Sequence, residues 1–195
     1  EASASLVFSL GLPLAPADWS GLSLAVGVSV AESLDPTGVH KVGLKWPNDV
    51  WVNDSKLAGI LIETALPSNG RPDASRYLVI GIGLNIGARE ADGMRTPPAW
   101  LRQWRPEASA PEVLAELAPP LVQAVLDFEA RGFAPFAERF AARDVLRGRE
   151  VALSDGTAGL CEGVAWGGEL QVRTDAGLQL ISSDEVSVRP RGMSF

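Results

Sequence analysis

The spacing of apolar positions predicts that strands dominate the first part of the chain. Apolar side chains recur at every second position in residues 6–10 and 42–46, which is typical of half-buried strands. We predict that the first of these strands ends at Gly11-Leu12-Pro13, because glycine and proline interrupt strand pairing. Residues 57–62 and 77–86 are almost wholly apolar and predict two further strands. The strands within residues 41–63 are separated only by short turns, which excludes helical crossovers there, so we expect a mixed, largely antiparallel sheet.

Two helical patterns accompany the strands. Residues 20–34 carry apolar side chains at every fourth position, and Pro36 follows as a stop signal. A second stripe with the same spacing runs through residues 113–125. We expect Pro119-Pro120 to break or kink that helix, since an interior proline costs about 3 kcal/mol. Phenylalanines at 133, 136 and 140 then predict a short helix packed into the core.

The pattern changes near residue 146, which we take as a domain boundary. Short strand-like runs alternate from there with glycine and aspartate, at 149–153, 158–164, 169–174, 177–181 and 185–189. The predicted domains are therefore residues 1–145 and residues 146–195, and we expect the second to form a small β-barrel. Within the first, residues 66–75 are polar and contain Pro, Gly and Asn, which predicts a loop.

Composition excludes several kinds of function. The net charge of −7 argues against a broad surface for nucleic acid or anionic membrane, and no run of about 18 apolar residues indicates a membrane span. A single cysteine, Cys161, allows no internal disulfide and no cysteine-rich zinc site. A single histidine, His40, leaves little scope for histidine-based metal sites or triads. We expect a cytoplasmic protein that uses carboxylates, amides, lysines, arginines and bound ions.

The segment from Lys45 to Glu63 combines features that a scaffold strand does not need. Lys56 begins an apolar strand, where a lysine is costly to desolvate without a partner. Gly59 weakens the same strand unless something approaches it closely. The three lysines of the chain all fall in or beside this segment, at 41, 45 and 56, although a solvated strand end is the alternative interpretation for each, least so for Lys56. Lys56 is therefore the first candidate for a functional site.

Three motifs in this order resemble the catalytic domain of biotin protein ligases. They are Lys45-Trp46-Pro47-Asn48-Asp49, Lys56-Leu57-Ala58-Gly59-Ile60-Leu61 and Gly81-Ile82-Gly83-Leu84-Asn85-Ile86. The stretch from Asp184 to Arg189 is similar to the family's usual Gly-Glu-Val-Ser-Leu-Arg ending, with aspartate where glycine is usual. The similarity runs from Glu1 to about Arg189. It implies an α+β fold, with a mixed, largely antiparallel sheet of the class II synthetase type and a small SH3-like β-barrel.

The resemblance implies that ATP activates biotin to biotinyl-5′-adenylate, and that biotin is then transferred to a lysine on the carrier domain of a biotin-dependent carboxylase. Lys56 is then the catalytic residue, contacting the biotin carboxylate and the α-phosphate, and Gly59 lets backbone and biotin approach. Asp49 and Asn85 match positions near the nucleotide and are oxygen ligands suited to Mg²⁺. The residues implied for ATP binding are Lys45, Asn48, Asp49, Asn85, Trp100 and Arg189. Ordinary turn, loop-packing and surface roles are the respective alternatives for Asn48, Trp100 and Arg189.

Further expectations concern the start of the chain and its assembly. The family's Gly/Arg-rich loop, which closes over the adenylate, lies upstream of Glu1, so we expect preceding residues to belong to the same domain. A DNA-binding domain, found in some members, would also lie upstream. We expect a homodimer through the sheet, since residues 77–84 form a long apolar strand that seeks a partner if left at an edge.

Two other functions compete with the biotin ligase. One is a lipoate-type ligase, whose lysine motif differs and which the predicted barrel disfavours. The other is a non-catalytic binder of biotin or its adenylate that acts as a regulatory module. A Gly-Arg-Gly-Arg-like loop upstream would favour the enzyme, and its absence would favour the binder.

Overall fold

The computed structural model of the chain describes residues 4–65, 76–90, 93, 96–182 and 188–190. Its first sheet has the strand order β1-β5-β4-β3-β2, and every pairing between these strands is antiparallel. The strands are β1 (Ser5–Leu14), β2 (Gly43–Lys45), β3 (Asp49–Val52), β4 (Ser55–Ala65) and β5 (Arg76–Asn85). The predicted α+β class and its largely antiparallel sheet are confirmed.

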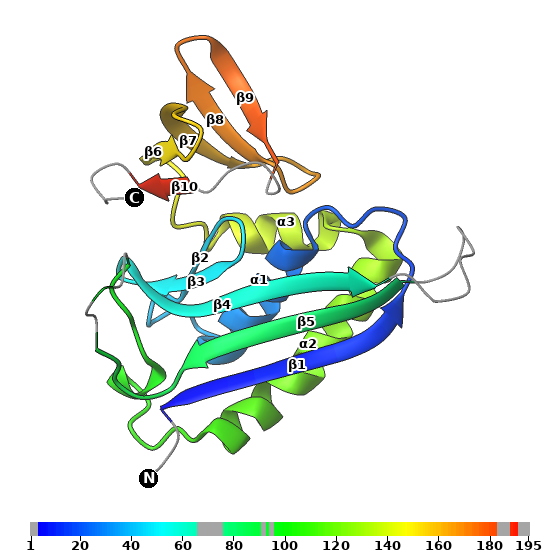
Figure 1. The fold of residues 1–195 in the computed structure, drawn as a ribbon, viewed down its shortest axis with the longest axis vertical. Coiled ribbons are helices and arrows are strands. Elements are labelled where there is room, and N and C mark those ends of the chain that lie inside the picture. The colour runs from blue at the N-terminus through cyan, green and yellow to red at the C-terminus, as the bar shows by residue number, and fades with distance from the viewer. Residues whose placement is uncertain (1–3, 66–75, 91–92, 94–95, 183–187, 191–195) are drawn as a thin grey trace.

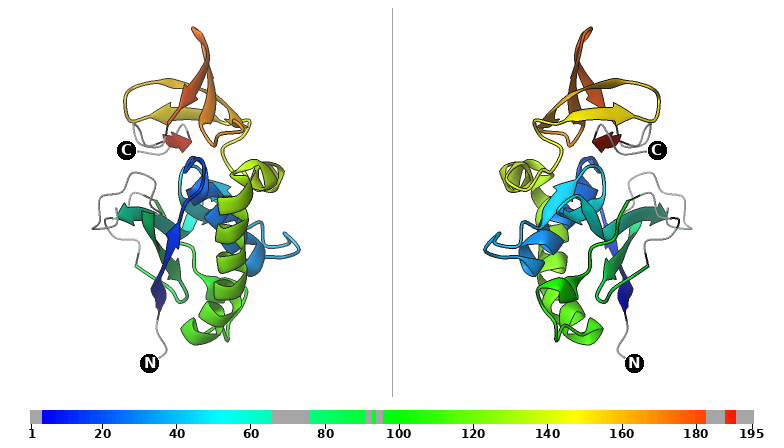
Figure 2. Two further views of the ribbon diagram at one scale, coloured as in Figure 1. Left: turned by 90° about the vertical axis from the view of Figure 1, so that its right-hand side faces the viewer. Right: turned by 90° about the vertical axis from the view of Figure 1, so that its left-hand side faces the viewer.

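Helices cover one face of this sheet (Figures 1 and 2). They are α1 (Leu22–Leu34), α2 (Ala110–Arg131), α3 (Ala134–Ala141) and a short 3-10 helix, η1 (Leu101–Gln103). In β1 and β5, and in β4 from Ala58 onward, the side chains of even-numbered residues point toward the helices and form the core, among them Leu6, Ile60 and Ile82. The odd-numbered side chains of these segments face away from α1 and α2, so any site on them is open to solvent unless a loop covers it. The register shift at the start of β4 reverses this alternation, so Leu57 lies in the core and Lys56 lies on the other face.

Two predictions about the strands are wrong. β1 does not end at Gly11 but continues through Pro13, because it is the outermost strand of the sheet and an edge strand tolerates a residue without an N–H donor. Residues 42–46 are fully buried rather than half-buried. The segment around Arg143 covers them, since Leu44 N–H donates to Arg143 O (2.7 Å) and Val145 N–H donates to Leu44 O (3.0 Å).

The predicted break in the second helix is also wrong, since α2 continues through Pro119-Pro120. Both prolines are exposed, so the carbonyl groups that they leave without a helical partner can be hydrated. Residues 117, 121, 125 and 128 of the same helix are buried against the rest of the core. Packing of this apolar stripe therefore outweighs the local penalty of the prolines.

The premise of the predicted homodimer does not hold, because β5 is an interior strand. It pairs with β1 along one side and with β4 along the other. Its backbone pairs on both sides and its apolar side chains pack within the first sheet and the core, so the strand does not require a partner chain. The homodimer itself stays a prediction without this support.

The second sheet has the order β10-β6-β7-β8-β9, again with antiparallel pairings. Its strands are β6 (Glu150–Leu153), β7 (Ala158–Val164), β8 (Leu170–Thr174), β9 (Gly177–Ile181) and β10 (Val188–Pro190). Cys161 is buried within it. The predicted loop at 66–75 and most of the predicted strand at 185–189 lie outside the described residues. The domain boundary near 146 and the barrel closure stay predictions.

The second sheet lies beyond the end of the first sheet that carries β2 and β3 (Figure 1). Within the described part of the chain, no helix is long and apolar enough to cross a membrane.

Candidate functional site

Lys56 and Gly59 of β4 meet Asp49 of β3 on the face of the first sheet opposite α1 and α2. Asp49 and Gly59 are direct partners in the strand register, and Lys56 Nζ lies 2.6 Å from Asp49 Oδ1. A Cβ atom added at Gly59 would lie 3.2 Å from Lys56 Nζ. The close approach that we predicted at Gly59 is therefore made, without any ligand, by the ammonium of Lys56.

Lys45 lies beside this pair but is largely shut off from solvent. It is the register partner of Asp49 across β2 and β3, and it is 8% exposed. Its Nζ donates to Trp46 O at 3.3 Å and lies 5.4 Å from the centre of the Trp51 ring. Direct contact between Lys45 and a nucleotide, as the sequence suggested, would be confined to this small exposed part.

The charges around Lys45 show that the predicted cationic residues gather in one place. Burial lowers the pKa of Lys45 to about 8, and Asp49 opposes this shift. Lys56 and Arg189 add to the lowering, so Arg189 of β10 contributes to the field at Lys45 from the second sheet. Lys45, Asp49, Lys56 and Arg189 thus form one electrostatic cluster, which we call the lysine–aspartate cluster.

Asn85 holds the neighbouring backbone in place. Its Nδ2 donates to Lys56 O (3.1 Å) and to Ala99 O (2.9 Å), while its Oδ1 accepts from Arg89 Nη1 (3.0 Å). The polar atoms of this amide are therefore engaged, and the neighbouring guanidinium is unfavourable for a cation. No group of three or more His, Cys, Asp or Glu side chains that could hold a metal occurs among the described residues. The Asp49–Asn85 metal site stays a prediction, and its donors fit poorly in this conformation.

Asn48 and the segment just before Trp100 both form hydrogen bonds with β4. Asn48 Nδ2 donates to Ile60 O and Ile60 N–H donates to Asn48 O, both at 2.9 Å, so Asn48 acts at least as a turn residue that ties β3 to β4. Residues 97–99 run beside Lys56, with Lys56 N–H bonded to Pro97 O (2.8 Å) and Ala99 N–H to Lys56 O (2.9 Å). This arrangement brings the backbone of Trp100 next to the strand that carries Lys56.

A cavity of about 350 Å³ adjoins the lysine–aspartate cluster, lined by Lys56, Gly59, Gly83 and Asn85 among others. Asp49, Gly59, Gly83 and Val7 form one row across β3, β4, β5 and β1. A Cβ atom at Gly83 would meet nothing within 4 Å, so this glycine leaves open space above the sheet. We did not single out Gly83 as a site residue, although the Gly-Ile-Gly sequence inside a strand was a usable signal.

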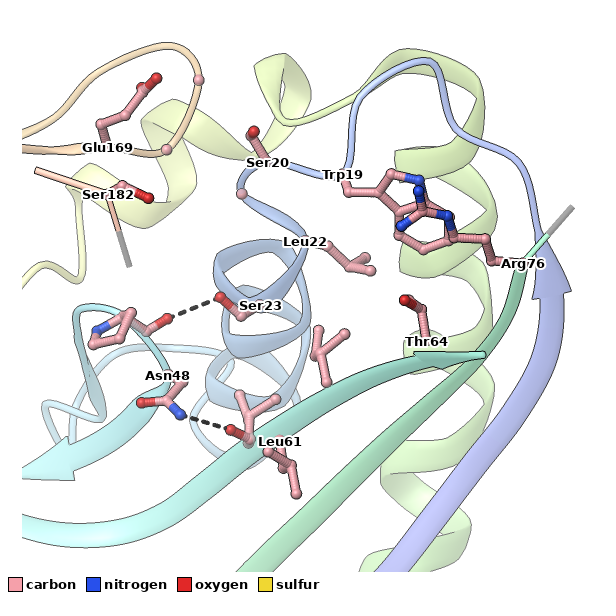
Figure 3. Close-up of a pocket in the computed structure, with 16 residues that line it drawn as sticks. Trp19, Ser20, Leu22, Ser23, Asn48, Leu61, Thr64, Arg76, Glu169 and Ser182 are labelled. Carbon is pink, nitrogen blue, oxygen red and sulfur yellow. Dashed lines mark hydrogen bonds between the residues drawn. The ribbon is translucent and has the colours of Figure 1, made fainter. Parts of the chain in front are cut away.

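A second cavity of about 500 Å³ lies between the two sheets and is drawn in Figure 3. Its lining includes the start of α1, Asn48, the outer end of β4 and the turn at 167–169. The Arg76 guanidinium lies 5.7 Å from the centre of the Trp19 ring at one end. Lys56 and Asp49 are not among its lining residues, so this larger cavity is a neighbour of the cluster rather than part of it.

Comparison with known proteins gives a consistent assignment. A model of the biotin/lipoate A/B protein ligase family matches residues 1–85. The biotin--[acetyl-CoA-carboxylase] ligase of Paracoccus denitrificans is 33% identical over 193 residues, covering 95% of this chain and 73% of that relative. The bifunctional ligase/repressor BirA of Escherichia coli (strain K12) is 32% identical over 179 residues, covering 89% of this chain and 54% of BirA. The chain thus spans about half the length of BirA.

The fold comparison agrees. The biotin protein ligase from Aquifex aeolicus, solved in complex with biotin and ATP, matches with a TM-score of 0.80 and 27% identity, over 96% of this chain and 79% of that chain. The chain belongs to the biotin/lipoate A/B protein ligase family. The resemblance to biotin protein ligases that its motifs indicated is confirmed.

Proposed function

We propose that the protein activates biotin with ATP and transfers it to a lysine of a carboxylase carrier domain. The observation that carries this proposal is the contact between Lys56 and Asp49 beside a 350 Å³ cavity. An ammonium in this place can bind both the biotin carboxylate and the α-phosphate, two anions that otherwise repel each other. Such positioned charge stabilises a phosphoryl-transfer transition state without a histidine.

The reaction proceeds in two displacements. A carboxylate oxygen of biotin bonds to the α-phosphorus, the bond from that phosphorus to the bridging oxygen breaks, and pyrophosphate leaves. The amine of the acceptor lysine then attacks the acyl carbon, AMP leaves with the phosphate oxygen, and the amine loses a proton. Lys56 serves the first displacement as a cation. Asp49, whose carboxylate lies 2.6 Å from that cation, orients it and is also positioned to accept a hydrogen bond from the incoming amine.

The remaining predicted residues surround the nucleotide in this proposal. Trp100 stacks on the adenine, and Arg189 approaches the phosphates from the second sheet. Asn85 holds the Lys56 backbone and the adjacent loop, as its hydrogen bonds indicate. ATP enters as its magnesium complex, in which phosphate oxygens and several waters supply ligands and a carboxylate such as that of Asp49 would add one. A biotin- and ATP-bound relative of the same fold supports both substrates.

An unpaired strand edge supports binding of the acceptor between the two sheets. The backbone of Ile60 bonds toward Asn48, and backbone groups of every second residue point to the same edge of a strand. Those of Ile62 and Thr64 therefore point away from β5, on the side of the larger cavity that both residues line, and none of the described strands pairs with them there. A strand of the carrier domain added there would continue the line of β3 and end beside Asn48.

The decisive experiment is biotin-dependent exchange of labelled pyrophosphate into ATP by the full-length protein. We expect exchange that requires both biotin and magnesium ATP. Exchange with lipoate instead of biotin would favour the lipoate-type alternative, and biotin binding without exchange would favour the regulatory binder. The need for ATP agrees with the cytoplasmic location that we propose.

A further inference from the structure

The short strand β3 is weakly defined by its own pairing. It has four residues, and its register with β4 shifts between Val50 and Trp51. Its other neighbour, β2, has only three residues. Short and irregular pairings specify the position of a strand poorly. β3 nevertheless carries Asp49, whose carboxylate lies 2.6 Å from Lys56 Nζ. Burial of Val50, Trp51 and Val52 sets which face of β3 lies in the core, and contacts from outside the first sheet can hold its two ends.

One such contact is made just before β3. Trp46 is 1% exposed, and its Nε1 donates to Gly168 O at 3.0 Å. Gly168 lies in the turn between β7 and β8, with φ at +92°. A Cβ atom there would lie 2.8 Å from the Cα of Gly21, the residue that caps α1. The turn therefore lies directly against the backbone at the start of α1, and Trp46 is bonded to a turn that has a second contact with the helical layer.

A second contact is made just after β3. Asn53 and Asp54 form the turn into β4, both with positive φ. Asp54 Oδ1 lies 2.5 Å from Arg149 Nη1. Arg149 immediately precedes β6, and its carbonyl accepts from Cys161 N–H (2.9 Å), which ties it to β7. Both charged side chains are partly exposed, so the pair adds little to global stability. Its effect is local, on the end of β3.

We propose that Trp46 and Arg149 are positioning residues through which the second sheet holds both ends of β3 and so sets Asp49 against Lys56. The second sheet and the β2–β3 end of the first sheet lie together in Figure 1. The inference rests on the proposed function, because Asp49 and Lys56 matter only if they serve that reaction. A displacement of about 1 Å at a reacting group can reduce a rate about a hundredfold, so modest loosening of β3 has a measurable effect.

The test compares three variants of the full-length protein in biotin-dependent pyrophosphate exchange. Trp46→Phe keeps an aromatic ring and removes the N–H donor, and Arg149→Gln removes the charge. Arg173→Gln is the matched control, because Arg173 pairs with Glu162 entirely within the second sheet. We expect kcat to fall about tenfold in the first two variants, with KM for biotin nearly unchanged. Arg149→Gln should leave the melting temperature nearly unchanged, whereas Trp46→Phe should lower it, because a smaller ring then replaces a buried side chain. The control is expected to behave like wild type, and Arg149→Lys should recover most of the lost rate.

A second measurement does not depend on activity. Amide hydrogen exchange of residues 49–52 should become faster in Trp46→Phe and Arg149→Gln and stay unchanged in Arg173→Gln. Unchanged protection in the first two variants, or a wild-type kcat in both, would overturn the inference. A loss of rate in Arg149→Gln that Arg149→Lys does not restore would also overturn it, since the position would then not act through its charge. Absence of pyrophosphate exchange in the wild type would instead refute the proposed function.

Discussion

Lys56 Nζ and Asp49 Oδ1 lie 2.6 Å apart, yet the two side chains differ in exposure, 42% for the lysine and 15% for the aspartate. The carboxylate is the sheltered member and the ammonium is the accessible one. Asp49 therefore orients the lysine while leaving its remaining donors free for an incoming anion. A surface ion pair contributes little to folding stability in water. The asymmetry of exposure therefore favours a role of this pair in substrate binding over a role in stability.

The first prediction concerns Lys56, the residue that supplies the positive charge. Lys56→Arg keeps the charge but replaces a compact head with a wider fork, which cannot reproduce the position of the Lys56 ammonium between Gly59 and Asp49. We expect a loss of roughly 3 kcal/mol of transition-state stabilisation, about a hundredfold in rate, by analogy with the loss of one oxyanion donor. Lys56→Ala should lose at least as much, with the melting temperature little changed. Pyrophosphate exchange measures both.

Lys41→Arg is the matched control for this series, because Lys41 is exposed and lies outside the lysine–aspartate cluster. It should exchange pyrophosphate like the wild type. If Lys56→Arg does so as well, Lys56 is an ordinary strand-end lysine and the main site assignment fails.

Substitutions at two glycines of the sheet distinguish the orientation of Lys56 from the binding of biotin. An added methyl at Gly59 would meet Lys56 Nζ at 3.2 Å, so Gly59→Ala displaces the ammonium and should lower kcat about tenfold or more. Gly83 has open space above it, so Gly83→Ala disturbs no protein contact and should instead raise KM for biotin. Steady-state kinetics with biotin as the varied substrate separates the two. Equal effects of both variants on kcat would show that the cavity beside Gly83 does not receive biotin.

The local sequence pattern singles out Lys56 and Gly59 as site candidates, because both break the preference of an apolar strand within a few residues, and their roles stay predictions. It could not predict which contacts fix them. Trp46 and Gly168 are 122 positions apart in the chain, and Asp54 and Arg149 are 95 apart. Such long-range contacts produce no periodic pattern in the sequence. Each of these residues, taken with its neighbours alone, has the features of an ordinary turn or strand residue.

The same limit explains the errors in the fold. A solvated strand end was our alternative reading for Lys45, but the segment around Arg143, about a hundred residues later, helps to bury this strand. The strand at 77–84 was treated as a possible edge, because the order of strands in a sheet follows from tertiary pairing rather than from local pattern. The prolines in α2 were judged by intrinsic propensity, which packing of the apolar stripe overrode.

The titration of Lys45 predicts a pH-dependent stability. The folded pKa is about 8 and the ordinary value is 10.5, so between these pH values the unfolded chain holds a proton that the folded protein has released. The free energy of unfolding therefore rises with pH across this window by about 3 kcal/mol from this group. Below pH 8 the burial penalty of the charged form is present in full.

Urea denaturation at pH 7 and pH 10 checks this prediction in the wild type and in Lys45→Met. The stability of the wild type relative to the variant should increase at the higher pH. Lys41→Met controls for removing a lysine elsewhere. A difference between wild type and Lys45→Met that does not change with pH would show that Lys45 is not buried as a charge in the folded protein.

The last prediction tests acceptor binding at the edge of β4 near Thr64, with which none of the described strands pairs. Thr64 pairs with Leu78 in the register of β5, and the alternation from Ile60 directs its N–H away from β5. Thr64→Pro therefore removes an edge donor without removing a bond of the sheet, which edge positions tolerate. Adenylate formation should stay within about twofold of wild type, while biotin transfer to a carrier domain should slow about tenfold, the effect of losing one hydrogen bond of about 1.4 kcal/mol. Thr64→Val keeps the N–H and is the control. Measuring pyrophosphate exchange and carrier biotinylation on the same preparations separates the two steps. Equal transfer by Thr64→Pro and Thr64→Val would mean that the carrier domain binds elsewhere on the protein.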